Sequence, residues 1–229
     1  MARLPRYGLP GQPQHVIQRG NNRGAMFARP ADYLHFRAYL ELACAEHECA
    51  VHAYVLMTNH VHLLITPSRA GAIGRVMQSV GRRYVPYYNW SQGRVGGLFQ
   101  GRFRAVPIDS EQYLFTCYRY IERNPVRAGI VRRLVDYRWS SYHANALGDP
   151  DSLVTPHDLY LTLGSETSTR LAAYRSVHGQ ELEESTLVAI RTAARTGWAL
   201  GGDQFRQELT QRSGRRAGPL IRGQRSSFN

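Results

Sequence analysis

The chain has 229 residues, of which 43% are hydrophobic, and its formal net charge is +12. This size and composition exclude a disordered chain and predict a globular fold with a buried core. No apolar run approaches the roughly 18 residues of a membrane span, and residues 1–13 lack the apolar segment of a signal peptide. The three cysteines form no CxxC motif, which favours reduced thiols. We therefore expect a cytoplasmic protein with no membrane partner.

Apolar periodicity predicts seven elements in the order β-α-β-β-α-β-α. Their ranges are residues 15–19, 30–43, 50–57, 60–66, 73–88, 103–108 and 111–123. Thr58-Asn59 separates the second and third strands by two residues, a length that suits a tight hairpin. This order predicts an α+β fold with an antiparallel sheet and helices on one face, as in ferredoxin-like or RRM-like proteins.

The composition changes after Trp139, where a linker rich in proline and aspartate over residues 149–156 precedes a helical remainder. Between Arg191 and Arg225 eight arginines face only Asp203 and Glu208, a local net charge of +6 (8 − 2). We predict a first domain over residues 1–147, followed by a linker and a basic helical C-terminal region over residues 148–229.

All basic side chains are arginine, because the chain contains no lysine. This excludes mechanisms that require a lysine, such as Schiff-base chemistry. Residues 49–108 contain seven arginines and no aspartate or glutamate. A surface normally mixes both signs of charge, so this stretch predicts a polyanionic ligand. Nucleic acid is the foremost candidate.

His60-Val61-His62 is the sequence feature that points most directly to a reaction. Side chains alternate between the faces of a strand, so His60 and His62 point the same way. Two imidazoles on one face can bind a divalent metal, although a pair of ordinary surface histidines gives the same pattern.

Tyr120 and Asn124 are one turn apart on the last predicted helix, just before Pro125. An amide oxygen from Asn124 could complete a ligand set of two imidazoles and one oxygen, which suits Mg or Mn and also fits Zn or Ni. A tyrosine hydroxyl attacks phosphate poorly unless a divalent ion polarises the phosphate. A core position for Tyr120 and a helix-capping role for Asn124 are the structural alternatives.

Three segments resemble the HUH single-tyrosine transposases, and more narrowly the REP-associated tyrosine transposases. They are residues 57–64 (MTNHVHLL), 98–103 (LFQGRF) and 120–129 (YIERNPVRAG). Residues 15–23 (HVIQRGNNR) and 139–142 (WSSY) also resemble that family. The resemblance covers roughly residues 5–145, so it implies that the domain over residues 1–147 is the HUH transposase domain.

The resemblance implies a metal pair at His60 and His62, a nucleophile at Tyr120 and a third metal ligand at Asn124. It also implies a central HUH strand, Mg or Mn as cofactor, and single-stranded or hairpin DNA as substrate. The expected products are a 5′-phosphotyrosine and a free 3′-OH. Because the chain is longer than the insertion-sequence branch of the family, both a homodimer and a monomer are compatible with the sequence.

The candidate DNA contacts are polar residues near the first strand and arginines of the carboxylate-free stretch: Arg19, Asn21, Arg23, Arg82, Arg102 and Arg104. We expect His15 and His52 to be packed or hydrogen-bonded rather than metal ligands. Two rival functions remain open from the sequence. One is a non-catalytic nucleic-acid-binding protein that acts on palindromic repeats, and the other is a metal-dependent phosphodiesterase without a covalent intermediate.

Overall fold

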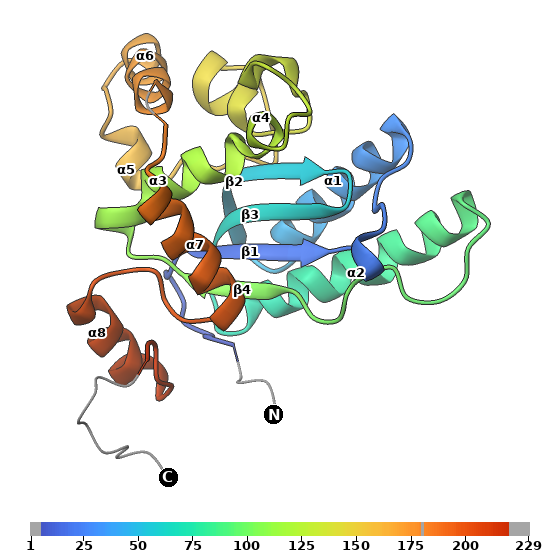
Figure 1. Ribbon diagram of the computed structural model, residues 1–229, viewed down its shortest axis with the longest axis horizontal. Helices are drawn as coiled ribbons and strands as arrows, with labels where there is room; N and C mark the ends of the chain where they lie inside the picture. Colours follow the sequence, from blue (N-terminus) through green and yellow to red (C-terminus); the bar gives the residue numbers. More distant parts are fainter. Residues whose placement is uncertain (1–5, 180, 220–229) are drawn as a thin grey trace.

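The computed structural model describes residues 6–179 and 181–219. Its centre is an antiparallel sheet with the strand order β2-β3-β1-β4 (Figure 1). The strands are β1 (Gln14–Arg19), β2 (Cys49–Met57), β3 (His60–Pro67) and β4 (Arg104–Pro107). The predicted α+β fold with an antiparallel sheet is confirmed, and the strand with the His60–His62 pair is one of the two central strands.

Strand register places the first strand directly beside the histidine pair. Ile17 of β1 lies opposite His62, and Arg19 lies opposite His60. On the other side of β3, Met57 pairs with His60 across the hairpin formed by Thr58 and Asn59, as the sequence predicts. A one-residue slip would turn both imidazoles to the other face of the sheet, so this register determines where the histidines point.

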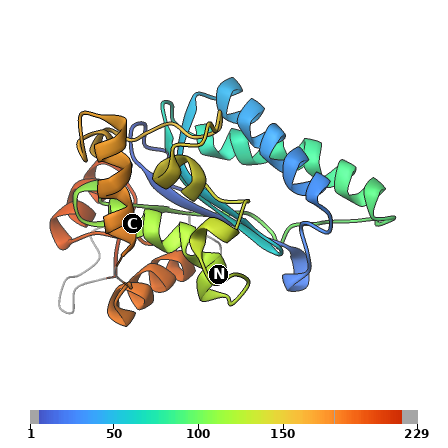
Figure 2. The same cartoon turned by 90° about the horizontal axis from the view of Figure 1, so that it is seen from above.

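The helices cover both faces of the sheet, which corrects the expectation that they all lie on one face. On one face, α1 (Pro30–Glu46) and α2 (Ala72–Ser91) enclose an apolar cluster that includes Val61 and Leu63. On the other face, α3 (Ser110–Glu122) packs against Leu64 in a second cluster (Figure 2). The reason is that the strands carry apolar side chains on both sides, so both sides have to be buried.

The C-terminal region is helical, as predicted, and three of its four helices contribute buried residues to the second apolar cluster. Its helices are α5 (Asp158–Leu161), α6 (Thr167–His178), α7 (Glu184–Thr196) and α8 (Asp203–Ser213). Shorter turns connect α3 to them: α4 (Asn124–Arg127), η2 (Leu134–Asp136) and η3 (His143–Leu147). Tyr174 of α6 and Ile190 of α7 share the cluster with Tyr118 of α3.

The division between residues 147 and 148 stays a prediction, although this shared cluster contains residues from both sides of it. Of the arginines expected in the basic C-terminal region, Arg222 and Arg225 lie outside the described residues. Within residues 6–179 and 181–219, no helix is long and apolar enough to span a membrane.

His52 is packed and hydrogen-bonded, as its position on a predicted strand suggested. Its Nδ1 lies 2.7 Å from the carbonyl oxygen of Thr155, and its Nε2 lies 2.8 Å from Oγ1 of Thr66. Burial lowers the pKa of His52 to about 4, because an imidazolium there would lose its solvation.

This shift predicts acid sensitivity of the fold. Since the unfolded pKa is about 6.5, neutral His52 contributes its full stability above that pH and loses it as the pH falls toward about 4. When the pH is lowered from 7.5 to 5, the free energy of unfolding should fall in both the wild type and the His52→Gln variant. We expect this fall to be about 2 kcal/mol smaller in His52→Gln than in the wild type, measured by urea unfolding. The exposed His35→Gln variant should lose as much as the wild type. Equal losses in all three proteins would contradict the assignment to His52.

Candidate active site

One pocket of about 470 Å³ collects most of the predicted site residues on the α3 face of the sheet. His60 and His62 enter it from β3, Tyr120 from α3 and Asn124 from α4. Three of the predicted DNA-binding arginines also line it: Arg19, Arg102 and Arg104. The structure therefore brings together residues that lie more than one hundred positions apart in the sequence.

His60 is oriented by the hairpin turn before it. Its Nδ1 lies 2.6 Å from Oδ1 of Asn59, and the Asn59 amide donates in turn to the carbonyl of Arg23 at 3.1 Å. The Asn59 oxygen accepts a hydrogen bond, so the proton of neutral His60 lies on Nδ1. The lone pair on Nε2 is then available for a ligand.

His62 is oriented by His15, which lies on the neighbouring strand β1. Nδ1 of His62 and Nε2 of His15 are 2.7 Å apart, and the two rings stack at 5.0 Å. If His62 donates from Nδ1, its Nε2 lone pair is free to bind a metal, and His15 then carries its own proton on Nδ1. His15 is buried and hydrogen-bonded, as predicted, but its contact with the metal-binding candidate was not predicted.

All three imidazoles are held neutral at physiological pH. Burial first, and the charge of Arg127 second, lowers the pKa of His15 to about 3. Burial and the neighbouring Arg19 lower the pKa of His60 to about 4, and burial with the adjacent His15 lowers that of His62 well below its usual value. Metal ions bind the neutral imidazole, so protonation does not compete with a metal ion for these nitrogens at physiological pH.

Tyr120 is the only tyrosine of α3 that lines the pocket within the described residues. Its ring centroid lies 5.8 Å from that of His62, and the guanidinium of Arg127 lies 4.3 Å from the centre of the ring. Tyr118 points away from the pocket and packs against Tyr174, where burial raises its pKa well above the usual value. This separation follows from the helix, because residues two positions apart lie on nearly opposite sides.

Asn124 begins a short helix instead of ending α3, which corrects its expected place at the C-terminus of that helix. Its amide nitrogen donates to the carbonyl of Tyr120 at 3.0 Å, and its oxygen accepts from Arg127 at 2.8 Å. A metal ion would therefore have to share this oxygen with a guanidinium. The ring centroids of His60 and His62 lie 4.9 Å apart, and the metal pair, like the third ligand Asn124, stays a prediction.

No group of three or more histidine, cysteine, aspartate or glutamate side chains could hold a metal ion in the part of the chain that the structure describes. A divalent ion at His60 and His62 would therefore take its remaining ligands from oxygen atoms. Those available are the Asn124 amide, water or a phosphate.

The pocket is strongly positive. Six arginines line it and no aspartate or glutamate does: Arg19, Arg102, Arg104, Arg127, Arg191 and Arg195. Low-dielectric walls lined with one sign of charge focus the field, so the site attracts anions such as phosphodiesters. Arginine also matches the geometry of phosphate oxygens.

Three predicted DNA contacts lie elsewhere. Asn21 and Arg23 are exposed in the turn η1 (Asn21–Arg23), and Arg82 is exposed on α2, which packs on the opposite face of the sheet. Conversely, five residues at the site were not predicted to act there: His15, Gln100, Arg127, Arg191 and Arg195. The spacing of Arg191 and Arg195 beside apolar positions of one helix was the available indication for those two.

A buried carboxylate fixes the helix that carries Tyr120. Glu122 is 1% exposed, and its oxygens accept from Ser141 Oγ at 2.6 Å and from the Tyr174 hydroxyl at 2.7 Å. Asn145 donates to it at 3.0 Å, and Nε2 of His178 lies 3.1 Å away. Glu122 thus joins α3 to α6 and to residues 139–142.

Residues 12–124 match the sequence model of the family described as "Transposase IS200 like". Over this segment the chain belongs to the IS200-like transposases. This confirms the family predicted from the motifs. No curated protein matches the sequence.

Two solved structures are similar to this IS200-like chain. One is a REP-associated tyrosine transposase bound to a REP hairpin, with 18% identity, a TM-score of 0.53, and coverage of 69% of this chain and 93% of the other. It shows the same fold. The second is a protein from Deinococcus radiodurans described as a transposase, with 17% identity, a TM-score of 0.36, and coverage of 51% and 98%.

The Glu122 contacts predict a large loss of stability when the charge is removed. In Glu122→Gln, an amide group faces several donors, so we expect the free energy of unfolding to fall by about 2 kcal/mol or more in urea titrations. The matched variant Glu111→Gln changes an exposed carboxylate on the same helix and should cost less than about 1 kcal/mol. A neutral effect of Glu122→Gln would show that these contacts do not hold α3 in place.

Proposed function

We propose that the protein is a DNA strand transferase that cuts and rejoins single-stranded or hairpin DNA through a 5′-phosphotyrosine at Tyr120. The observation that carries this proposal is the meeting of Tyr120 with His60 and His62 in one pocket lined by six arginines and no carboxylate. Membership of the IS200-like transposases supports it, as does the shared fold of a transposase whose structure contains a REP hairpin.

The arginines bind and orient the DNA strand. Phosphodiesters are the anions that a net charge of +12 and this pocket attract, and each neutralised phosphate releases counterions. Arg19 and Arg102 have no side-chain partner among residues 6–179 and 181–219, so their guanidinium groups are available to phosphate oxygens. Binding should therefore weaken steeply as the salt concentration rises.

Tyr120 acts as the nucleophile. Its hydroxyl oxygen forms a bond to the phosphorus of the scissile phosphate while the bond from phosphorus to the 3′ oxygen breaks. The 3′ oxygen leaves with a proton as a free 3′-OH, and the tyrosine proton passes to water. Because the phosphodiester energy is kept in the phosphotyrosine, a 3′-OH can later attack it and restore the tyrosine hydroxyl.

His60 and His62 hold the cofactor, for which we propose Mg or Mn. Such an ion polarises the phosphate and stabilises the negative charge of the transition state when it is bound. Asn59 and His15 keep the two imidazoles in the tautomers that leave Nε2 free. Arg127, above the Tyr120 ring and bonded to Asn124, positions both residues at the same phosphate.

Tyr120→Phe should abolish a detergent-stable covalent adduct with labelled hairpin DNA in the presence of Mn, while DNA affinity stays within about twofold. The reason is that only the attacking hydroxyl is removed. The control is Tyr113→Phe on the same helix, which should form the adduct normally. An adduct that survives in Tyr120→Phe would disprove the nucleophile.

The same assay separates the rival functions. Cleavage without any adduct would indicate a phosphodiesterase. Tight, salt-dependent binding without cleavage, tested on hairpins from the DNA around the gene, would indicate a binding protein for palindromic repeats.

His60→Gln and His62→Gln should each weaken Mn binding about tenfold or more, measured by titration calorimetry and by the loss of the free-ion EPR signal. Each variant removes one of the two nitrogen ligands that the site offers. His35→Gln, an exposed histidine of α1, serves as the matched control and should bind Mn like the wild type. Unchanged affinity in both site variants would place the metal elsewhere.

A further inference from the structure

Helix α7 lies across the face of the sheet that carries the candidate site, although its residues come some seventy positions after Tyr120 (Figure 1). Its apolar residues Leu187, Ile190 and Ala193 are buried in the cluster that contains α3 and β4 residues. Arg191, Ala194 and Arg195, on an adjacent stripe of the same helix, line the pocket. Burial of the apolar side therefore fixes the orientation of the helix. In this orientation its arginines face the pocket that contains Tyr120.

A contact between β4 and α7 holds this arrangement. Arg104 of β4 donates a hydrogen bond to the carbonyl of Ala194 at 2.9 Å, at the wall of the pocket. Backbone bonds link the chain after α7 to the same strand, from Leu200 to Pro107 at 2.9 Å. Helix α7 is thus attached to the edge strand of the sheet through Ala194 and through the chain that follows the helix.

The two arginines of α7 differ in their partners. Arg191 forms an ion pair with Glu184 at 2.9 Å, which is exposed and therefore weak. Arg195 has no hydrogen bond or ion pair in the part of the chain that the structure describes. An unpaired guanidinium in a pocket with five other arginines is electrostatically unfavourable unless an anion occupies the pocket.

We propose that α7 forms one wall of the strand-binding site, where Arg191 and Arg195 bind phosphates of the DNA strand next to the one that Tyr120 attacks. The ligand class is a single-stranded phosphodiester, bound between the basic side of α7 and the strands β1, β3 and β4. This inference rests on the proposed function for the position of the cut, but it concerns binding and can be tested without cleavage.

The test measures the affinity of a fluorescent oligothymidine of roughly ten nucleotides, a length within the usual range of single-strand sites. It uses the full chain in the Tyr120→Phe background, so that no covalent step contributes. We expect Arg195→Gln to weaken binding about 3- to 10-fold at moderate salt and to reduce the slope of log affinity against log salt by about 0.7. Arg191→Gln should have a smaller effect, because Glu184 already pairs with it.

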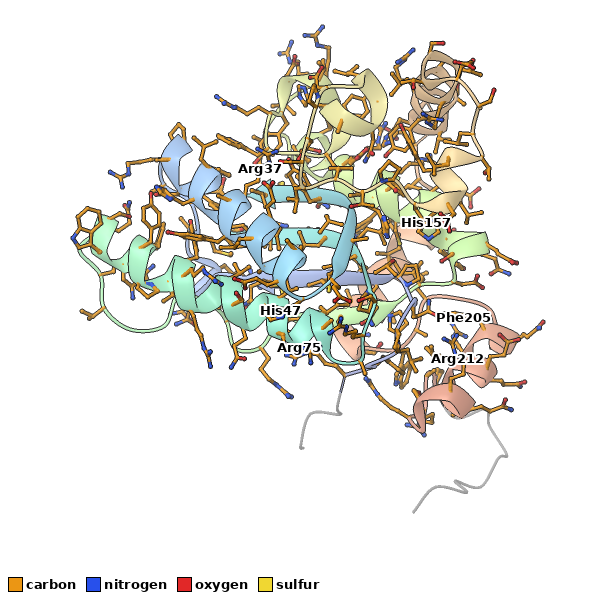
Figure 3. The ribbon with its side chains drawn as sticks, turned by 180° about the vertical axis from the view of Figure 1, so that it is seen from behind. Arg37, His47, Arg75, His157, Phe205 and Arg212 are labelled. Atoms are coloured by element: carbon orange, nitrogen blue, oxygen red, sulfur yellow. The ribbon has the colours of Figure 1, made fainter. Side chains whose placement is uncertain are left out.

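Arg212→Gln is the matched control. Arg212 lies on α8, outside the pocket, and its loss changes the net charge of the C-terminal region by the same amount (Figure 3). It should change the affinity less than twofold. Equal effects of Arg195→Gln and Arg212→Gln, or tighter binding after Arg195→Gln, would overturn the proposal.

Chemical protection gives a second readout that needs no variant. Phenylglyoxal modifies accessible arginines, and peptide mass spectrometry reports each site separately. Saturating oligothymidine should slow the modification of Arg195 and leave that of Arg212 unchanged. Unprotected Arg195 in a protein that binds the oligonucleotide would overturn the inference for α7 while leaving the assignment of Tyr120 intact. If Arg195 is protected but no covalent adduct forms, the inference for α7 would stand and the assignment of Tyr120 as nucleophile would fall.

Discussion

The alternation of side chains along β3, in a sheet covered on both faces, determines on which face the candidate site is built. Val61 and Leu63 point to the face closed by α1 and α2, and both are fully buried. His60 and His62 point to the other face, beside Ile17 and Arg19 of β1. Because the period of a strand is two residues, one face can be closed by apolar packing while the other keeps polar groups around a pocket.

The buried polar groups that support the site on that second face are stable because they have hydrogen-bonding partners. His15 bonds to His62, and Asn59 bonds to His60, so both imidazoles are oriented before any ligand arrives. Glu122 provides the corresponding support for α3 through Ser141 and its other donors. Such preorganisation lowers the cost of binding a metal ion and a phosphate, since little has to be rearranged at the moment of binding. The arginines receive less internal support, which suits residues that await an anion.

The features that could be predicted from the sequence are those encoded locally. Strand alternation was enough to put His60 and His62 on one face, and helical spacing was enough to separate Tyr120 from Tyr118. The antiparallel sheet followed from the two-residue hairpin and from the β-α-β-β-α-β-α order of the elements. The family motifs likewise indicate the transposase family, because each is a short local segment of the sequence.

The features that could not be predicted depend on which surfaces meet. The near-continuous burial of β2 shows that both faces of the sheet are covered, and an apolar run such as Cys49–Met57 is the sequence sign of this. The position of α7 has no such sign in the sequence. Leu187 and Ile190 predict an amphipathic helix, but they do not specify the apolar cluster that the helix joins. The hydrogen bond from Arg127 to Asn124 likewise depends on the break between α3 and α4. Pro125 indicates this break in the sequence, but it does not indicate the hydrogen bond.

In the proposed mechanism one tyrosine of this pocket forms the covalent bond to DNA, and the sequence offers a direct test. Trypsin cleaves after Arg119 and Arg123, so residues 120–123 form a peptide whose only tyrosine is Tyr120. The covalent adduct should be digested with nuclease and trypsin and analysed by mass spectrometry. We expect the nucleotide mass on this peptide. A nucleotide on a peptide that contains Tyr113 or Tyr118, or on any other residue, would contradict it.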